Sequence, residues 1–188
     1  MTKLLSAKAP PPEIGELEDL IPRPMLFPGE NSIAYEDLRD ALLGDLAPGA
    51  PYEQALAENL VTLEWEAIRH RRMRDTLIKA KARDLAVGVF STGEVEEAFF
   101  PAEKHEMLGS ALISADRKSA AKAAAALKKH DISLDEIFAK AYSRVSNQLE
   151  LHEKKLADLE TRRRRLRDDY ERLKAARARP VEDAEIIG

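Results

Sequence analysis

The chain contains no cysteine and few aromatic residues among its 188 positions. The absence of cysteine excludes a disulfide scaffold, an iron–sulfur centre and a zinc site with cysteine ligands. Aromatic residues make up 5% of the sequence and charged residues 34%, a balance that favours long, solvent-exposed helices over a thick globular core. No apolar run approaches the roughly 18 residues that a membrane span requires. The apolar pair Leu4–Leu5 is also too short for a secretory signal, so we expect a cytoplasmic protein with no membrane partner.

Motifs that carry catalysis or cofactor binding are also missing. The sequence has no glycine-rich phosphate loop, no G-x-S-x-G and no H-E-x-x-H. Its four histidines are His70, His105, His130 and His152, and none has a second histidine at metal-ligand spacing. His152 falls on an apolar helix stripe, so we interpret it as a packing or register feature and not as a ligand. We therefore predict no enzyme activity, no cofactor, no metal and no small-molecule substrate.

Proline placement divides the chain into segments. Eight of the ten prolines fall within the first 51 residues. We therefore expect residues 1–31 to form an extended, proline-rich arm. Pro180 should end the last helix, leaving an acidic tail over residues 180–188. Between the arm and the tail, residues 32–179 are expected to form a helical domain.

Apolar spacing predicts the first two helices of this domain. A helix is expected over about 33–46, with Asn31 or Ser32 as its N-cap. A second helix is expected from Pro51 to about Val87. It carries two adjoining apolar stripes, which indicates contact with two other elements.

The next segment is less regular. Residues 88–109 are interrupted by glycine and proline, and they predict only short helical pieces that cap one end of a bundle. Residues 110–130 are rich in alanine and strongly helix-prone.

The clearest pattern lies nearer the C-terminus. Ser133 followed by Glu136 matches a capping box, in which each side chain satisfies a backbone N–H of the helix start. From there a 4-3 repeat predicts a helix over about 134–178, on the order of 65 Å long. Nine of its twelve seam positions are apolar. These nine are Phe138, Tyr142, Val145, Leu149, Leu156, Leu159, Leu166, Tyr170 and Leu173.

Together these segments predict an all-α fold. The second and last helices should form a long antiparallel helical hairpin or coiled coil, accompanied by a small helical bundle and the extended N-terminal arm. Any unmatched length of the last helix would project or pair with another protomer. We therefore expect a non-enzymatic scaffold or adaptor that self-associates or binds a partner helix along the seam.

Basic residues are concentrated in two segments although the net charge of the chain is −4. Segment 69–83 has seven basic residues against one acidic, and segment 161–179 has nine against three. Clustered guanidinium groups can bridge phosphates, which makes nucleic-acid binding the alternative function. Arginine-rich helices also form solvated, salt-bridged faces, so both interpretations stay open. The candidate contacts are Arg69, Arg71, Arg72, Arg74, Arg162, Arg163, Arg164, Arg165 and Arg167.

Several short motifs carry a resemblance to a known group. They are Pro28-Gly29-Glu30-Asn31, Tyr35-Glu36-Asp37-Leu38, Leu46-Ala47-Pro48, Leu63-Glu64-Trp65-Glu66, Arg69-His70-Arg71-Arg72 and Val181-Glu182-Asp183-Ala184-Glu185. With these motifs the chain resembles a group of bacterial proteins met especially in alphaproteobacteria, often near mobile-element genes. The resemblance covers residues 28–83 and 155–186. Many members carry a basic segment before Pro-Gly-Glu, which this chain lacks. The resemblance implies a bacterial origin and an association with DNA-handling elements, but no activity and no site residues. The alternative function is therefore that of a nucleic-acid-associated accessory protein of a mobile element or phage, which would act through the two arginine-rich segments.

Overall fold

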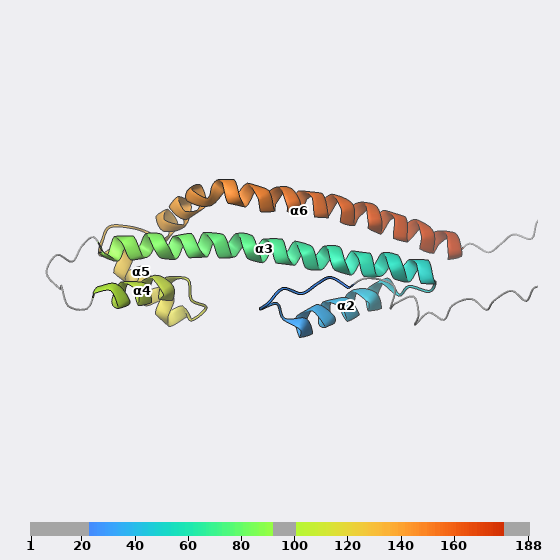
Figure 1. Cartoon of the computed structure of the whole chain (residues 1–188), viewed down its shortest axis with the longest axis horizontal. Coiled ribbons are helices and arrows are strands. Elements are labelled where there is room, and N and C mark those ends of the chain that lie inside the picture. The colour runs from blue at the N-terminus through green and yellow to red at the C-terminus, as the bar shows by residue number, and fades with distance from the viewer. Residues whose placement is uncertain (1–22, 92–100, 179–188) are drawn as a thin grey trace, which may run out of the picture. The chain divides into compact units, whose positions relative to one another are not determined.

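The computed structural model describes residues 23–91 and 101–178, and each regular element in these ranges is a helix (Figure 1). The helices are α2 (Ser32–Leu46), α3 (Pro51–Ser91), α4 (Pro101–Leu112), α5 (Arg117–Lys128) and α6 (Leu134–Ala178). The all-α prediction is confirmed. None of these helices combines the length and the apolar character that crossing a membrane requires. Most of the proposed arm and all of the acidic tail lie outside the described residues.

The start of α2 follows the predicted cap. The Asn31 side-chain oxygen accepts hydrogen bonds from the N–H groups of Ile33 and Ala34 at 3.0 and 3.2 Å. The preceding turn is closed by the Glu30 N–H donating to the Phe27 carbonyl at 2.9 Å. Gly29 occupies the third turn position with φ of 88°, a conformation that glycine adopts without a steric penalty. This stretch therefore leads directly into α2.

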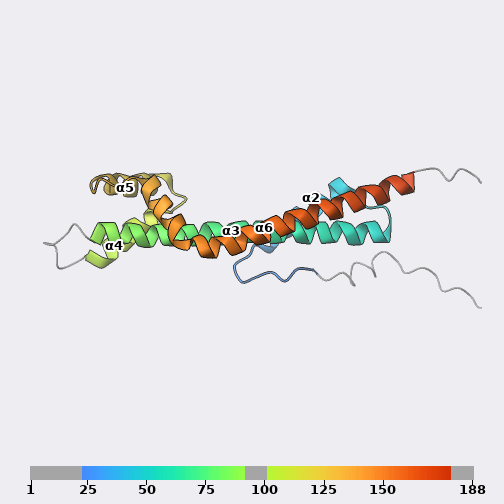
Figure 2. The same ribbon diagram turned by 90° about the horizontal axis from the view of Figure 1, so that it is seen from above.

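The long helices are each continuous in both views (Figures 1 and 2). The capping box at the start of α6 is confirmed, because the Glu136 N–H donates to Ser133 Oγ at 3.2 Å and the Ser133 N–H donates to Glu136 Oε2 at 2.8 Å. Helix α3 extends to Ser91, beyond the expected end near Val87. An internal glycine costs a helix only about 1 kcal/mol. Burial of Phe90, which is 3% exposed, offsets that cost.

The segment 110–130 is not one helix. It is divided between α4 and α5 by a short connection after Leu112. The Asp116 carboxylate accepts hydrogen bonds from the N–H groups of Lys118 and Ser119, at 3.3 and 3.1 Å, and so caps the new helix start. Aspartate at such a position competes with helix continuation, which outweighs the helix propensity of the alanines.

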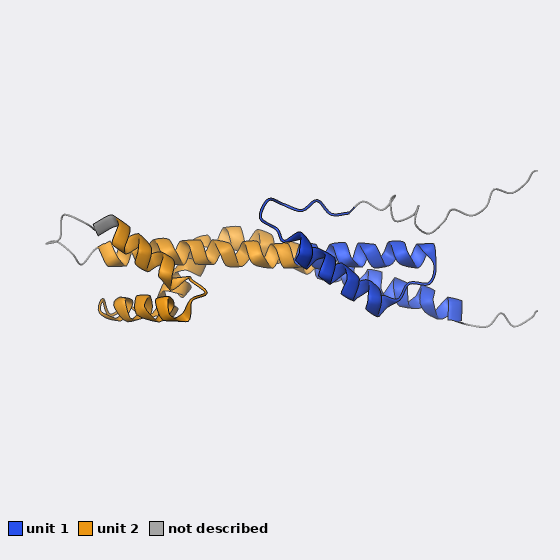
Figure 3. Ribbon diagram, turned by 90° about the horizontal axis from the view of Figure 1, so that it is seen from below, with its two compact units in different colours: residues 1–67, 158–188 blue, residues 68–157 orange. Residues whose placement is uncertain are grey.

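The chain divides into two compact units (Figure 3). Unit 1 comprises residues 1–67 and 158–188, and unit 2 comprises residues 68–157. Helices α3 and α6 each contribute one part to each unit.

In unit 1, α2 and the last part of α6 pack against the first part of α3. The Tyr35 and Trp65 rings meet edge to face, with centroids 5.3 Å apart. Tyr170 is fully buried, and its hydroxyl donates to the Leu46 carbonyl at 2.9 Å. Lys174 Nζ donates to the same carbonyl at 2.7 Å. The end of α2 is thus held by α6, because these donors satisfy a carbonyl that has no partner within the helix.

In unit 2, small side chains form much of the core. Its buried cluster draws on α3, α4, α5 and α6, and consists of Ala82, Ala86, Phe90, Leu112, Ala123, Leu127, Ile137 and Ala141. At Gly109, a Cβ atom would lie 2.6 Å from Val87 Cγ2 and 3.2 Å from the Arg83 carbonyl oxygen. Helix α4 therefore approaches α3 at a distance that only glycine permits here.

Candidate functional site

The apolar stripe of α6 is largely used within the chain. In unit 1, Leu159 and Tyr170 are buried, and the half-buried Leu166 and Leu173 pack around Tyr170, Leu56 and Ala57. The pairing of Glu64 with Arg163 and of Glu53 with Arg177 shows that α3 and α6 run antiparallel in this unit. These seam positions therefore face α2 and α3 and are not open to a partner.

Unit 2 uses the remaining seam positions in a similar way. Val145 and Leu149 are buried, at 9% and 1% exposure. Phe138 packs against the alanine-rich core and Leu156 is half-buried. The α6 stripe of this unit is therefore also engaged within the chain, except at Tyr142.

Tyr142 departs from the predicted stripe. It is 46% exposed, and its hydroxyl donates to Glu153 Oε1 at 3.1 Å. Ile137 and Ala141 are buried instead, so the buried positions at this end of α6 recur every four residues. Each step of four rotates the stripe by about 40° around the helix. The stripe thereby turns toward a core of alanines, where the small Ala141 side chain packs closely and a tyrosine would not fit.

Most arginines of the second basic segment form ion pairs. Arg163 donates to Glu64 at 2.6 Å and to Glu160 at 2.7 Å. The hydrogen bond to Glu64, and to a lesser degree the one to Glu160, raises the pKa of the Arg163 guanidinium. Arg162 pairs with Asp158 at 3.2 Å, and Arg164 with Glu160 at 3.5 Å. This arrangement is typical of a salt-bridged helix face.

The other candidate arginines divide into those with an interaction partner and those without an ion-pair partner. Arg74 pairs with Asp75 at 2.9 Å, and Arg69 and Arg72 also have interaction partners. Of the nine candidates, three exposed arginines have no carboxylate at ion-pair distance within residues 23–91 and 101–178. They are Arg71 in unit 2 and Arg165 and Arg167 in unit 1. Three of the nine candidate arginines thus lack an ion-pair partner in these ranges, and the proposed nucleic-acid contacts stay a prediction.

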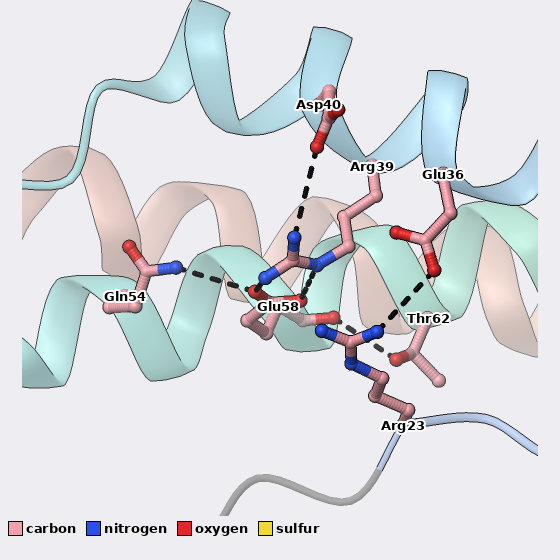
Figure 4. A network of polar contacts seen from close by, with 7 residues as sticks. All are labelled: Arg23, Glu36, Arg39, Asp40, Gln54, Glu58 and Thr62. Atoms are coloured by element: carbon pink, nitrogen blue, oxygen red, sulfur yellow. Dashed lines mark hydrogen bonds and ion pairs between the residues drawn. The ribbon is translucent and has the colours of Figure 1, made fainter. Parts of the chain in front are cut away.

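A more strongly engaged arginine lies in unit 1, outside both segments (Figure 4). Arg39 of α2 reaches Glu58 of α3 with two nitrogens, Nε at 3.1 Å from Oε2 and Nη2 close to Oε1. Gln54 Nε2 donates to the same carboxylate at 3.3 Å. Both charged side chains are nearly buried, at 12% and 9% exposure. This network joins two helices and is a structural element of the unit.

Unit 2 has a groove between α4 and α5, which we call the α4–α5 groove. It has a volume of about 720 Å³. Its lining is mostly apolar and also carries charged side chains; the lining residues are Glu103, Lys104, Met107, Leu108, Ala111, Ser119, Lys122, Ala125, Ala126 and Lys129. Met107 is 72% exposed. Sequence reasoning missed this groove, although the lysines spaced among alanines after Arg117 and the isolated Met107 were a signal for it.

The start of α5 gives the groove a fixed edge. Hydrogen bonds from the Ser119 side chain and from the Ser119 and Lys118 backbone hold the pKa of the Asp116 carboxyl below its ordinary value of 3.8. The ionised cap therefore holds the first turn of α5 in place. The groove wall that this helix provides is anchored at that end.

A second close-range feature of unit 2 joins α3 to α6. The Nδ1 atoms of His70 and His152 lie 3.0 Å apart, and the ring centroids 5.3 Å. The pattern placed His152 on the seam but gave no reason to pair it with His70. Two residues 82 positions apart carry no shared local spacing, so only the antiparallel packing brings them together.

Larger groups of ligating side chains do not occur in the described part of the chain. Across residues 23–91 and 101–178, no three histidine or carboxylate side chains are placed to hold a metal ion. Buried side-chain nitrogen and oxygen atoms in these ranges all have hydrogen-bond partners.

Comparison with known proteins adds no further assignment: no protein-family model, curated protein or solved structure matches this chain.

Proposed function

We propose that this protein is a non-enzymatic helical adaptor of the cytoplasm that binds an acidic amphipathic helix of a partner protein in the α4–α5 groove. The observation that carries this proposal is the combination of apolar side chains and three lysines lining one groove of about 720 Å³. The α6 stripe, by contrast, packs within its own chain in each unit. The groove is therefore the better candidate for a partner helix.

The shape and chemistry of the groove favour a helix as its occupant. Its two walls are helices of 12 residues each, a length of about 18 Å at 1.5 Å per residue. A partner helix of about three turns would match this length and place apolar residues at i, i+3, i+4 and i+7 against the apolar side chains of the lining. The exposed thioether of Met107 can adapt to different side chains, which is how methionine serves many helix-binding grooves.

Charge determines which kind of helix fits. Lys104, Lys122 and Lys129 line the groove, against the single carboxylate of Glu103. A helix with glutamate or aspartate on the flanks of its apolar stripe would complement these lysines, whereas a lysine-flanked helix would be repelled. The proposal is therefore specific about the sign of the partner's charge.

Synthetic peptides test this proposal directly. The probe is a fluorescent amphipathic peptide with leucines at i, i+3, i+4 and i+7 and flanking glutamates, and its counterparts are a lysine-flanked version and a scrambled version. Anisotropy should show saturable binding of the glutamate-flanked peptide alone. Ala125→Glu, which places a carboxylate in the groove lining, should weaken binding about tenfold, equivalent to about 1.4 kcal/mol.

Two matched controls separate the groove from general charge. Ala121→Glu introduces the same charge on α5 at an exposed position that does not line the groove, and it should bind as the wild type does. Lys122→Glu should weaken binding, while Arg144→Glu, an equal charge change on α6, should not. Equal effects of Ala121→Glu and Ala125→Glu would refute the groove as the binding site.

The second candidate function is contact with nucleic acid. It is supported by the three exposed arginines Arg71, Arg165 and Arg167, which lack an ion-pair partner among residues 23–91 and 101–178. The resemblance to proteins encoded near mobile elements points in the same direction. We rank it second because the other six candidate arginines are engaged by protein groups.

A further inference from the structure

The histidine pair of unit 2 goes beyond the proposed adaptor function, and it involves no residue of the α4–α5 groove. His70 belongs to α3 and His152 to α6, and both side chains are half-buried. Their rings are tilted by 54°, and the two Nδ1 atoms lie 3.0 Å apart. In this contact one Nδ1 carries a proton and donates, while the other accepts.

The separation of the two nitrogens matches one edge of a metal coordination sphere. Metal–nitrogen bonds to imidazole are about 2.0–2.1 Å long. With nitrogens 3.0 Å apart, such bonds subtend about 90° at the metal, whereas the tetrahedral angle preferred by zinc would require a separation of about 3.4 Å. An angle near 90° suits neighbouring positions of a square-planar or tetragonal ion, which among nitrogen-bound metals means Cu²⁺ or Ni²⁺.

We propose that His70 and His152 form a two-histidine chelate for Cu²⁺. Ni²⁺ would bind in the same geometry with lower affinity. Water fills the remaining coordination positions. The ring that donates in the metal-free contact shifts its proton from Nδ1 to Nε2, so both Nδ1 lone pairs face the ion and no net proton is released. The bound ion clamps α3 to α6 within unit 2.

Nearby charges are partly neutralised by ion pairs. Arg74, one turn beyond His70 on α3, pairs with Asp75 at 2.9 Å. Lys154, close to His152 on α6, pairs with Glu150 at 2.7 Å. These carboxylates offset two of the nearby cations, whereas Arg71, next to His70 in the sequence, has no ion-pair partner in the described residues.

The test uses full-length protein from which any histidine tag has been removed. Isothermal titration calorimetry with Cu²⁺ should give one ion per chain, and thermal melting should show a rise in Tm on adding the ion. His70→Ala and His152→Ala should each lower the affinity at least about tenfold, since even loss of a residue that only orients a ligand costs 10–100-fold. Electron paramagnetic resonance of the copper form should show a tetragonal centre with two nitrogen ligands.

Matched variants keep the result interpretable. His130→Gln removes a half-buried histidine elsewhere in unit 2 and should leave binding unchanged. His152→Asn keeps more side-chain volume than His152→Ala. If it also loses copper binding, the loss comes from the missing imidazole and not from looser packing of α3 against α6. Unchanged copper affinity in the His70→Ala, His152→Ala double variant would overturn the proposal and identify the ion as adventitious. A tetrahedral copper signature would equally refute the chelate geometry.

Discussion

The buried ion pair between Arg39 and Glu58 gives the sharpest prediction about stability. Replacing Arg39 with methionine removes the guanidinium but keeps much of its aliphatic volume. Glu58 is then left 9% exposed, with Gln54 Nε2 at 3.3 Å as a remaining donor. Removing one partner of a buried pair costs about 3–5 kcal/mol. Because the Gln54 donor remains, we expect Arg39→Met to lower the free energy of unfolding by about 3 kcal/mol.

The paired substitution separates the charge from the packing. Arg39→Met combined with Glu58→Leu removes both charges and leaves an apolar contact between α2 and α3. Such replacements of a whole buried pair are often neutral or stabilising. The double variant should therefore recover most of the stability that Arg39→Met loses, giving a coupling between the two sites of about 2–3 kcal/mol.

The assay is urea unfolding followed by circular dichroism, with Asp40→Asn as the control. Asp40 also lies near Arg39, at 3.8 Å, but its side chain is 76% exposed. An exposed pair contributes at most about 1 kcal/mol, so this control should shift the midpoint little. Two results would contradict this prediction: Arg39→Met lowering the free energy of unfolding no more than Asp40→Asn does, or the double variant being as unstable as Arg39→Met alone. Either would show that Arg39 and Glu58 do not behave as a buried ion pair.

Three further predictions address other parts of the chain. Gly109→Ala should lower Tm, because its Cβ would lie 2.6 Å from Val87 Cγ2, whereas Gly44→Ala, where a Cβ meets nothing within 4 Å, should raise it slightly. Hydrogen bonds from Ser119 lower the pKa of Asp116, and hydrogen bonds from Ser133 lower the pKa of Glu136. A carboxyl whose pKa is lower in the folded than in the unfolded state stabilises the fold above its unfolded pKa, and this stabilisation is lost as the pH falls through the folded pKa. The Tm deficit of Asp116→Asn at pH 7 should therefore shrink as the pH falls below 3.8. Anisotropy with random-sequence DNA should give a log–log salt slope no steeper than about −3, and a slope of about −4 or steeper would favour the nucleic-acid alternative.

The helix ends of this fold follow from local sequence to different degrees. The capping box of Ser133 and Glu136 and the cap at Asn31 are defined by side chains within three residues of the backbone groups they satisfy, so the pattern predicts them. The end of α3 depends on burial of Phe90 by other helices, which local spacing does not contain. The division at Asp116 is also local, because its carboxylate caps the N–H groups of Lys118 and Ser119, but the high helix propensity of the surrounding alanines conceals it in the sequence.

The candidate sites were less predictable than the helices. The position of Tyr142 could not be derived, because a heptad pattern assumes one partner helix, and unit 2 instead surrounds α6 with an alanine-rich core from three helices. The histidine pair and the α4–α5 groove depend on side chains brought together by tertiary packing. Local periodicity gives the face of each helix but not the identity of the residues opposite it.

The α6 repeat shows why a heptad pattern alone does not establish a binding surface. The pattern requires only that one stripe of the helix be covered, and coverage by α3 of the same chain satisfies it as well as a partner would. Burial of Leu149, Leu159 and Tyr170 within their own units leaves a second chain with little apolar area to gain along that stripe. A partner must instead use apolar surface that the fold leaves uncovered. The α4–α5 groove provides such surface, with lysines placed to select the charge of what binds there.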